Sequence, residues 1–256
     1  MAKFRYNAFN PAIEHPYFTH STELSMPQPD AIQYALIAAL ASGDVISGSD
    51  LALRLGISRA AIWKRVVSLR ELGLDVSGSA GRGYQLSLPH EPLDADVIRT
   101  TLSSQTRKLV PEIEVVWQVD STNSVLMARS GVGEGRASAL LAEVQTSGRG
   151  RRGRAWQSAV GGSLTLSLRW TFDRGMSALA GLSLVAGLSV VAALQDVGID
   201  GVGLKWPNDV VAEDRKLAGI LVEIGGEAQG PCHAVIGIGI NIRIDTSTAA
   251  CIDQPW

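Results

Sequence analysis

Two prolines, Pro89 and Pro92, mark the point where the pattern of this 256-residue chain changes. Before them, apolar residues recur at helical spacing, whereas beyond them short runs with strand periodicity mix with helices. Because prolines interrupt regular structure, we expect a linker here and two folded units, residues 30–89 and 90–256. Residues 1–29 contain four prolines and no sustained periodicity. They are expected to form a mobile arm, with translation starting at Met1 or Met26.

The first unit carries the signature of a winged helix-turn-helix. Its helical segments are separated by glycines, which end helices readily because they adopt the left-handed conformation. The expected helices span residues 31–41, 50–55 and 59–72, with glycine stops at Gly43, Gly56 and Gly73 and serine caps at Ser49 and Ser58 for the second and third. Residues 74–88 then alternate around a glycine-rich tip, which predicts a two-stranded wing.

A local excess of positive charge lies around the third predicted helix. The segment from Arg54 to Arg70 holds five basic residues and no acidic one, although the whole chain has a net charge of −2. In a helix-turn-helix the second helix of the motif, here the third predicted helix at residues 59–72, enters the DNA major groove and is called the reading helix. We therefore predict that this unit binds duplex DNA. The alternative is a solvated amphipathic helix in a module without a DNA target. The candidate DNA contacts are Ser58, Arg59, Lys64 and Arg65.

Composition argues against several other classes. The two cysteines, Cys232 and Cys251, form no CxxC pair, so a disulfide framework or a cysteine zinc site is not expected. The four histidines are scattered without metal-ligand spacing, which leaves no candidate metal site. The apolar stretch 176–194 is broken by Gly181 and Gly187 and predicts a buried helix, not a membrane span. No secretory signal opens the chain, and a cytoplasmic protein is expected.

The second unit combines strands with a few helices. Strands are predicted at residues 113–120, 137–145 and 163–170, and again within 202–213, 216–224 and 233–242. A helix is predicted after a cap at Ser121 or Thr122, and a long one at 179–197. This mixture predicts an α+β fold in which helices cover a mixed sheet.

The most unusual segment, residues 148–154, reads GRGRRGR and interleaves four arginines with three glycines. Glycine lets backbone N–H groups approach an anion, and arginine supplies planar charged forks for carboxylate or phosphate. One interpretation is a loop that wraps a small anionic ligand; the other is a solvated basic loop or a nucleic-acid patch. RNA binding by stacking requires interleaved aromatic residues, and only Trp156 lies near.

Two lysines and a polar strand end extend this candidate site. Lys205 leads into the turn KWPND, and Lys216 stands before an apolar strand, where it suits a carboxylate or phosphate. Gly237 and Gly239 fit close packing and ligand contact equally well. Asn241, polar at the end of an apolar run, is the better functional candidate.

Together these segments resemble the biotin protein ligases. VDSTNS, AEVQTSGRGRRGRAW, LKWPNDVV, DRKLAGILVE and VIGIGIN occur in the order and spacing of that family. The segment SGSDLALRLGISRAAIWK resembles the winged helix of its bifunctional class, which also represses biotin-synthesis genes. The resemblance covers residues 31–256 and implies an N-terminal winged helix-turn-helix followed by a mixed-sheet α/β catalytic domain of the biotin/lipoate ligase type.

The resemblance also implies roles for individual positions. The implied biotin contacts are Ser121, Thr122, Asn123, Gln145, Arg149, Gly150, Arg151, Lys216 and Gly219. The implied ATP contacts are Arg154, Trp156, Lys205, Asn208 and Asn241. The implied catalytic residues are Arg151, Lys205 and Lys216, whose charges stabilise negative charge developing at the phosphate, and Asp209, which orients the acceptor lysine.

The implied activity is an ATP-dependent ligation. Biotin is activated as biotinyl-5'-AMP, with Mg²⁺ neutralising the triphosphate, and is then transferred to a lysine of a biotin carboxyl carrier protein. The implied partners are this carrier, operator DNA and a second copy of the chain when the adenylate is bound. The alternatives are a regulator that senses biotinyl-AMP without efficient transfer, and a lipoate or octanoate ligase.

The family continues past the last residue of this sequence with further helix and a small β-barrel domain. We therefore expect the catalytic domain to be incomplete, without that C-terminal barrel. Residues 242–256 resemble the loop that covers the adenylate and are expected to be mobile without ligand.

Overall fold

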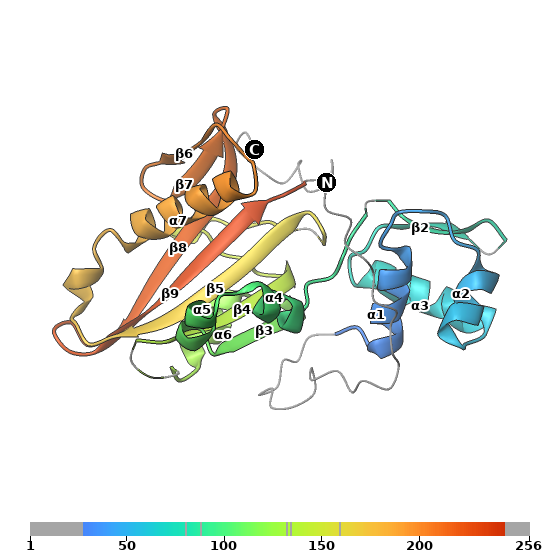
Figure 1. The fold of residues 1–256 in the computed structure, drawn as a ribbon, viewed down its shortest axis with the longest axis horizontal. Coiled ribbons are helices and arrows are strands. Elements are labelled where there is room, and N and C mark those ends of the chain that lie inside the picture. The colour runs from blue at the N-terminus through green and yellow to red at the C-terminus, as the bar shows by residue number, and fades with distance from the viewer. Residues whose placement is uncertain are drawn as a thin grey trace.

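The computed structural model describes residues 28–243 apart from 80, 88, 132, 134 and 159, and these residues form two units (Figure 1). The first unit comprises α1 (Ala31–Leu40), α2 (Gly48–Leu55), α3 (Arg59–Glu71) and a hairpin of β1 (Val76–Ser79) and β2 (Gly83–Leu86). This is the predicted winged helix-turn-helix. The predictions of a mobile arm and a mobile tail fall mainly on residues 1–27 and 244–256, outside the described residues.

Local sequence explains where these helices begin and end. Ser58 caps α3 by accepting a hydrogen bond from the Ala61 N–H, and Gly56 ends α2 with a φ of 65°. The predicted cap of α2 at Ser49 is wrong, because the helix begins earlier, at Gly48. Ser47 is the cap, and its Oγ accepts a hydrogen bond from the Asp50 N–H at 3.0 Å.

The second unit is built on a seven-stranded mixed sheet of strand order β3-β4-β5-β9-β8-β7-β6. Only β3 and β4 pair in parallel, joined by α6, and every other neighbouring pair is antiparallel. The elements are α4 (Ala95–Thr101), α5 (Ser104–Leu109), β3 (Glu112–Val119), α6 (Thr122–Ala128), β4 (Ala137–Gln145), β5 (Ser163–Phe172), α7 (Leu182–Asp196), β6 (Val202–Lys205), β7 (Asp209–Ala212), β8 (Arg215–Gly226) and β9 (Cys232–Asn241). The α+β prediction is therefore confirmed.

Two details differ from the sequence-based expectation. Helices α4 and α5 were not predicted, although Asp94 and Ser103 cap them. The segment 202–213 forms two strands, because the turn in KWPND reverses the chain between β6 and β7. The strict alternation predicted for β5 is present, since its side chains alternate between buried and half-buried from Ser163 to Arg169.

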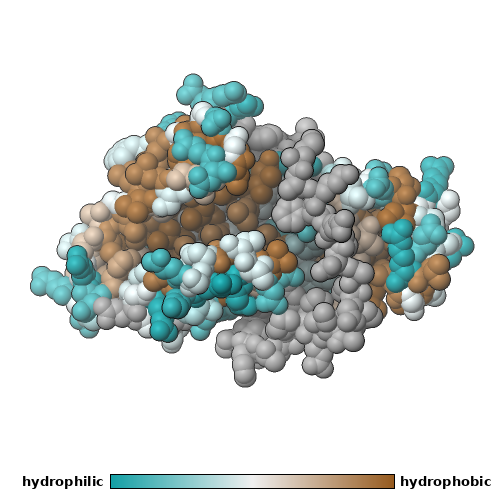
Figure 2. Space-filling model, viewed as in Figure 1, coloured by the Kyte–Doolittle hydropathy of each residue, from teal (hydrophilic) through white to brown (hydrophobic). Residues whose placement is uncertain are grey.

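Helix α7 covers one half of the sheet with a single face. Its buried residues, Ala186, Gly187, Val190 and Leu194, pack over β6, β7 and β8. The prediction of a buried helix is thus wrong for the opposite face, where Val185 remains 61% exposed. By length and composition alone the stretch Met176–Asp196 could cross a membrane. Figure 2 shows hydrophobic residues gathered on this side of the sheet, between α7 and the pair α4 and α5.

The two units meet around β3, the edge strand of the sheet. Trp117 of β3 is fully buried within the core of the first unit, and its indole N–H donates to the Leu72 carbonyl at 3.4 Å. The side-chain amide of Gln28 pairs with this strand, accepting from the Trp117 N–H at 2.7 Å and donating to the Gln118 carbonyl at 2.8 Å. Residue 28, predicted to be part of a mobile arm, is therefore fixed against the sheet.

A buried histidine and a buried glutamate also join the units. The backbone N–H of His90 donates to the Ala41 carbonyl at the end of α1. The imidazole Nε2 of His90 lies 3.4 Å from Oε2 of Glu143 in β4. The other carboxyl oxygen of Glu143 accepts from the Leu93 N–H at 2.6 Å. Burial lowers the pKa of His90 to about 4 and raises the pKa of Glu143 to about 7, so both groups favour their neutral forms.

Candidate active site and DNA-binding helix

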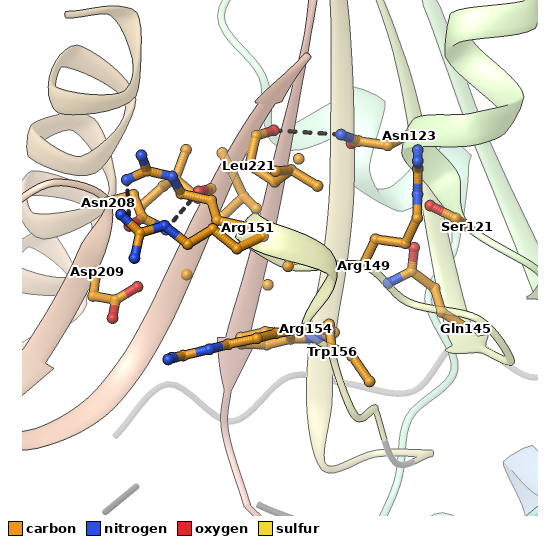
Figure 3. A pocket seen from close by; sticks show the side chains of 18 of the residues that line it. Ser121, Asn123, Gln145, Arg149, Arg151, Arg154, Trp156, Asn208, Asp209 and Leu221 are labelled. Carbon is orange, nitrogen blue, oxygen red and sulfur yellow. Dashed lines mark hydrogen bonds between the residues drawn. The ribbon is translucent and has the colours of Figure 1, made fainter. Parts of the chain in front are cut away.

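A cavity of about 430 Å³ opens on the α6 side of the sheet (Figure 3). It lies between the start of α6, the Arg/Gly loop at 148–154, the KWPND turn and the glycines of β8 and β9. From the predicted biotin, ATP and catalytic positions, the structure brings these to its wall: Ser121, Thr122, Asn123, Gln145, Arg149, Gly150, Arg151, Arg154, Trp156, Asn208, Asp209, Lys216 and Gly219.

One end of the cavity is a buried polar network. Ser121 caps α6, and the N–H and hydroxyl of Thr122 donate to Oε1 of Gln145 at 2.8 and 3.0 Å. Ser167 of β5 contacts the Thr122 hydroxyl at 2.7 Å and donates to the Asn123 side-chain oxygen at 2.6 Å. Since buried polar groups with satisfied hydrogen bonds hold a fixed geometry, this end is preorganised for a polar ligand.

Glu223 ties this network to the Arg/Gly loop. Its Oε2 accepts hydrogen bonds from both the Asn123 amide and the Arg149 guanidinium, each at 2.8 Å. Sequence reasoning gave Glu223 no role, although it closes the motif DRKLAGILVE. The position of this carboxylate at the end of that motif could have indicated a role in the site.

The Arg/Gly loop folds back on itself and reaches across the cavity. The Gly150 N–H donates to the Arg154 carbonyl at 2.7 Å and the Trp156 N–H to the Gly148 carbonyl at 2.8 Å. Arg151 then donates to the Asn208 side-chain oxygen at 3.2 Å, which links the loop to the KWPND turn, as Figure 3 shows.

The opposite end of the cavity holds an ion pair. Nζ of Lys216 lies 2.9 Å from Oδ1 of Asp209, and both side chains are largely buried. Asn208 fixes the turn that carries Asp209. Its side-chain amide donates to the Ile220 carbonyl at 3.0 Å, and its backbone carbonyl accepts from the Ile220 N–H at 2.9 Å. The charges of this end are thus held in place by backbone hydrogen bonds.

Glycines form the floor of the cavity. A Cβ at Gly239 would overlap the indole of Trp156, and one at Gly237 would overlap the amide of Asn123. The indole also contacts Lys216, whose Nζ lies 5.8 Å from the ring centroid. Gly237 and Gly239 both line the cavity and make room for the side chains that shape it.

Two predicted positions are not brought to this cavity. Lys205 is exposed at the end of β6 and does not line it. Asn241 donates to the Lys216 carbonyl at 3.2 Å and lines a neighbouring cavity of about 260 Å³ with Arg215, Lys216 and Arg243. Arg152, which was not predicted, lines the main cavity together with the other arginines.

The predicted DNA contacts lie on α3 in different surroundings. Arg59 and Lys64 are exposed, and Ser58 is the exposed helix cap. Arg65 instead forms an ion pair with Asp30, the cap of α1, so its guanidinium is held against the first helix. Arg70, at the end of α3, donates to the carbonyls of Val76 and Gly78 and supports the wing.

Each of the two units matches a known family of domains. The family model described as biotin/lipoate A/B protein ligase matches residues 115–241, and an HTH domain model matches residues 33–85. The bifunctional ligase/repressor BirA of Salmonella typhimurium is 44% identical over 226 residues, covering 88% of this chain and 68% of that protein. The bifunctional ligase/repressor BirA of Escherichia coli is 42% identical over 228 residues, covering 89% and 68%.

The chain therefore belongs to the biotin/lipoate protein ligase family, within the group of bifunctional ligase/repressors. Among solved structures, the biotin protein ligase from Aquifex aeolicus in complex with biotin and ATP has a TM-score of 0.43 and 31% identity, covering 57% of this chain and 62% of that one.

Proposed function

We propose that this protein activates biotin with ATP as biotinyl-5'-AMP, transfers the biotinyl group to a lysine of a biotin carboxyl carrier protein, and represses transcription through its winged helix. The observation that carries the ligase proposal is the cavity itself. It places a fixed polar network at one end, a cation–carboxylate pair at the other and the Arg/Gly loop between them.

The polar end suits the ring system of biotin. Neutral donors and acceptors of Thr122, Asn123 and Gln145 are already ordered by Ser167 and Glu223, so they match an uncharged polar heterocycle without reorganisation. Gly219 lies at the far end beside Lys216. Biotin held in this orientation points its carboxylate toward Lys216.

In the first step, a carboxylate oxygen of biotin attacks the α-phosphorus of ATP, the bond to the bridging oxygen breaks, and pyrophosphate leaves. Negative charge builds on the α-phosphate, and we assign its stabilisation to Lys216 and Arg151, which both line the cavity. Fixed cations in a site shielded from water stabilise such charge strongly. We place Arg154, Trp156 and Asn208 on the nucleotide side, with Lys205 and Asn241 entering the site only if the segments that carry them move.

Magnesium is expected with the nucleotide. In the described residues the two carboxylates beside the cavity, Asp209 and Glu223, are each bound to a cation, and no group of three metal-ligating side chains is found. We infer that Mg²⁺ enters the cavity with the triphosphate. When bound, the ion neutralises phosphate charge.

The ion pair of Lys216 and Asp209 links the two steps. An anionic biotin carboxylate or acyl phosphate competes for Lys216, which releases the Asp209 carboxylate. Asp209 can then orient the acceptor lysine and accept a proton as the amine nitrogen attacks the acyl carbon and AMP leaves. The acyl–phosphate bond breaks and an amide bond forms. Because the amide is more stable than the acyl phosphate, the transfer is favourable.

We place the repressor function in residues 30–89 and catalysis in residues 90–256. Operator DNA meets Arg59 and Lys64 on α3, and a second copy of the chain joins when the adenylate is bound, so that two reading helices engage a symmetric site. ATP, biotin, the carrier and DNA all meet this protein in the cytoplasm.

The ligase proposal is tested by incubating the full chain with biotin, ATP, Mg²⁺ and a carrier domain and measuring pyrophosphate release and the intact mass of the carrier. Lys216→Ala and Arg151→Ala should each slow pyrophosphate release by about two decades, the value of one cation at developing charge. Arg136→Ala, which removes an exposed cation outside the cavity, is the matched control.

Parallel reactions with lipoate and octanoate separate this function from its relatives. If either acid were transferred as fast as biotin, the protein would be assigned to the lipoate or octanoate ligases. Pyrophosphate release without any mass gain on the carrier would instead identify a sensor of biotinyl-AMP.

A further inference from the structure

Trp63 is an exposed aromatic side chain on the reading helix. It is the fifth residue of α3 and is 50% exposed, whereas the large apolar residues Ile62, Val66 and Leu69 of the same helix are fully buried. The core of the first unit is therefore complete without it. The indole is therefore available for contact with a partner.

The surroundings of Trp63 indicate the kind of partner. Arg59 lies one helical turn before it and Lys64 directly after it, and α3 has no acidic residue before Glu71. Two copies of such a surface repel each other, because like charges would face like charges. A polyanion with apolar groups in a groove suits both the cations and the indole.

We propose that Trp63 reads the 5-methyl group of a thymine in the major groove of the operator, an inference that rests on the proposed DNA binding. The thymine methyl is the apolar feature that base pairs present in the major groove. Residues in the first turns of a recognition helix are those that reach base edges. Arg59 and Lys64 then position the helix on phosphates, and Trp63 contributes sequence preference.

The test uses DNA selected by the protein itself. Duplexes bound by the full chain with biotin and ATP are enriched from a random pool, and each thymine of the selected site is replaced in turn by uracil, which lacks only the methyl group. At one thymine per half-site the replacement should weaken binding by the wild-type protein about fourfold, the value of one buried methyl group.

The variant Trp63→Ala should bind the selected duplex more weakly and lose its sensitivity to uracil at that thymine. Trp63→Leu, which keeps an apolar side chain, should bind better than Trp63→Ala. Leu53→Ala is the control, since Leu53 is 83% exposed on α2, and it should leave the uracil effect unchanged. Unchanged pyrophosphate release with biotin and ATP shows that the catalytic unit of each variant is folded, and an unchanged circular dichroism spectrum shows that α1–α3 are retained.

Several results would overturn the proposal. Equal uracil effects in wild-type protein and both Trp63 variants, or no effect at any thymine of a selected site, would refute methyl readout while leaving DNA binding intact. Loss of self-association in Trp63→Ala, with an unchanged uracil profile, would assign the side chain to a second copy. Failure to enrich any duplex would refute the proposed DNA binding itself, and this inference with it.

Discussion

The buried carboxyl group of Glu143 should make the stability of this protein depend on pH in a way that one substitution removes. Glu143→Gln preserves the shape of the side chain and an oxygen that can accept the Leu93 N–H. It abolishes ionisation and replaces the oxygen beside His90 by an NH2 group. Glu143 is 3% exposed, and its pKa is raised to about 7 from the usual 4.5, because burial disfavours the carboxylate.

The direction of the pH dependence follows from the linkage between folding and proton binding. An acid with a raised pKa in the folded state contributes stability that is fully present below pH 4.5 and is lost as the pH rises through 7. A separation of about 2.5 pH units, at about 1.4 kcal/mol per unit, corresponds to about 3 kcal/mol of lost unfolding free energy at pH 8. The Gln variant should be more stable than wild type by that amount at pH 8 and equal to it at pH 4.5.

His90 contributes the opposite slope. Its pKa is lowered to about 4 from 6.5, so its contribution is present above pH 6.5 and is lost as the pH falls through 4. Between pH 4.5 and 6.5 the two slopes cancel in the wild type. In Glu143→Gln only the His90 slope remains, and the stability of the variant should rise with pH across this range.

Thermal unfolding followed by circular dichroism measures the difference. For a chain of this size, about 3 kcal/mol corresponds to a Tm higher by roughly 6–12 °C at pH 8. Glu112→Gln, an exposed position on the neighbouring strand β3, is the control and should change Tm little. If Glu143→Gln lowered Tm at pH 8, the carboxylate would be ionised and paired with His90, and the argument from burial would be refuted.

Three further outcomes are expected. Asp209→Asn should slow transfer to the carrier by about two decades, as expected for loss of a general base. Pyrophosphate release should slow less, and equal slowing of both steps would place Asp209 in the first step. Gly239→Ala should displace the Trp156 indole and speed dissociation of the adenylate, and the same change added to Trp156→Ala should have little further effect. Arg59→Ala and Lys64→Ala should each reduce the slope of log affinity against log salt by about 1, and an unchanged slope would remove that residue from the phosphate contacts.

The parts of the fold that follow from local chemistry could be predicted from the sequence. Gly56 and Gly73 mark helix ends, and the alternation of β5 marks a half-buried strand, because each signal depends on neighbouring residues only. Helices α4 and α5 were missed since they are short and bury no residue of their own. The cap of α2 was misplaced because serine occurs at both 47 and 49.

The candidate site was accessible to sequence reasoning for a different reason. Its residues stand in distinctive motifs, so the resemblance brought Gln145, Arg151 and Lys216 together before any geometry was known. The contact that orders its polar end was not accessible. Asn123 and Glu223 are 100 positions apart in the chain, and only the tertiary fold makes them neighbours.

The burial of Trp117 limits how far the DNA-binding unit can be treated as a cassette. The indole belongs to a strand of the catalytic sheet, yet it fills the core formed by α1, α3 and the wing, with its ring edge-on to Tyr34 at 6.0 Å. A fragment excised at the linker would carry an indole-sized hollow. By the scale of tryptophan-to-alanine changes, that hollow removes about 3–5 kcal/mol of stability. Transplanting this winged helix onto another protein would therefore require a substitute for a side chain that lies outside its own sequence.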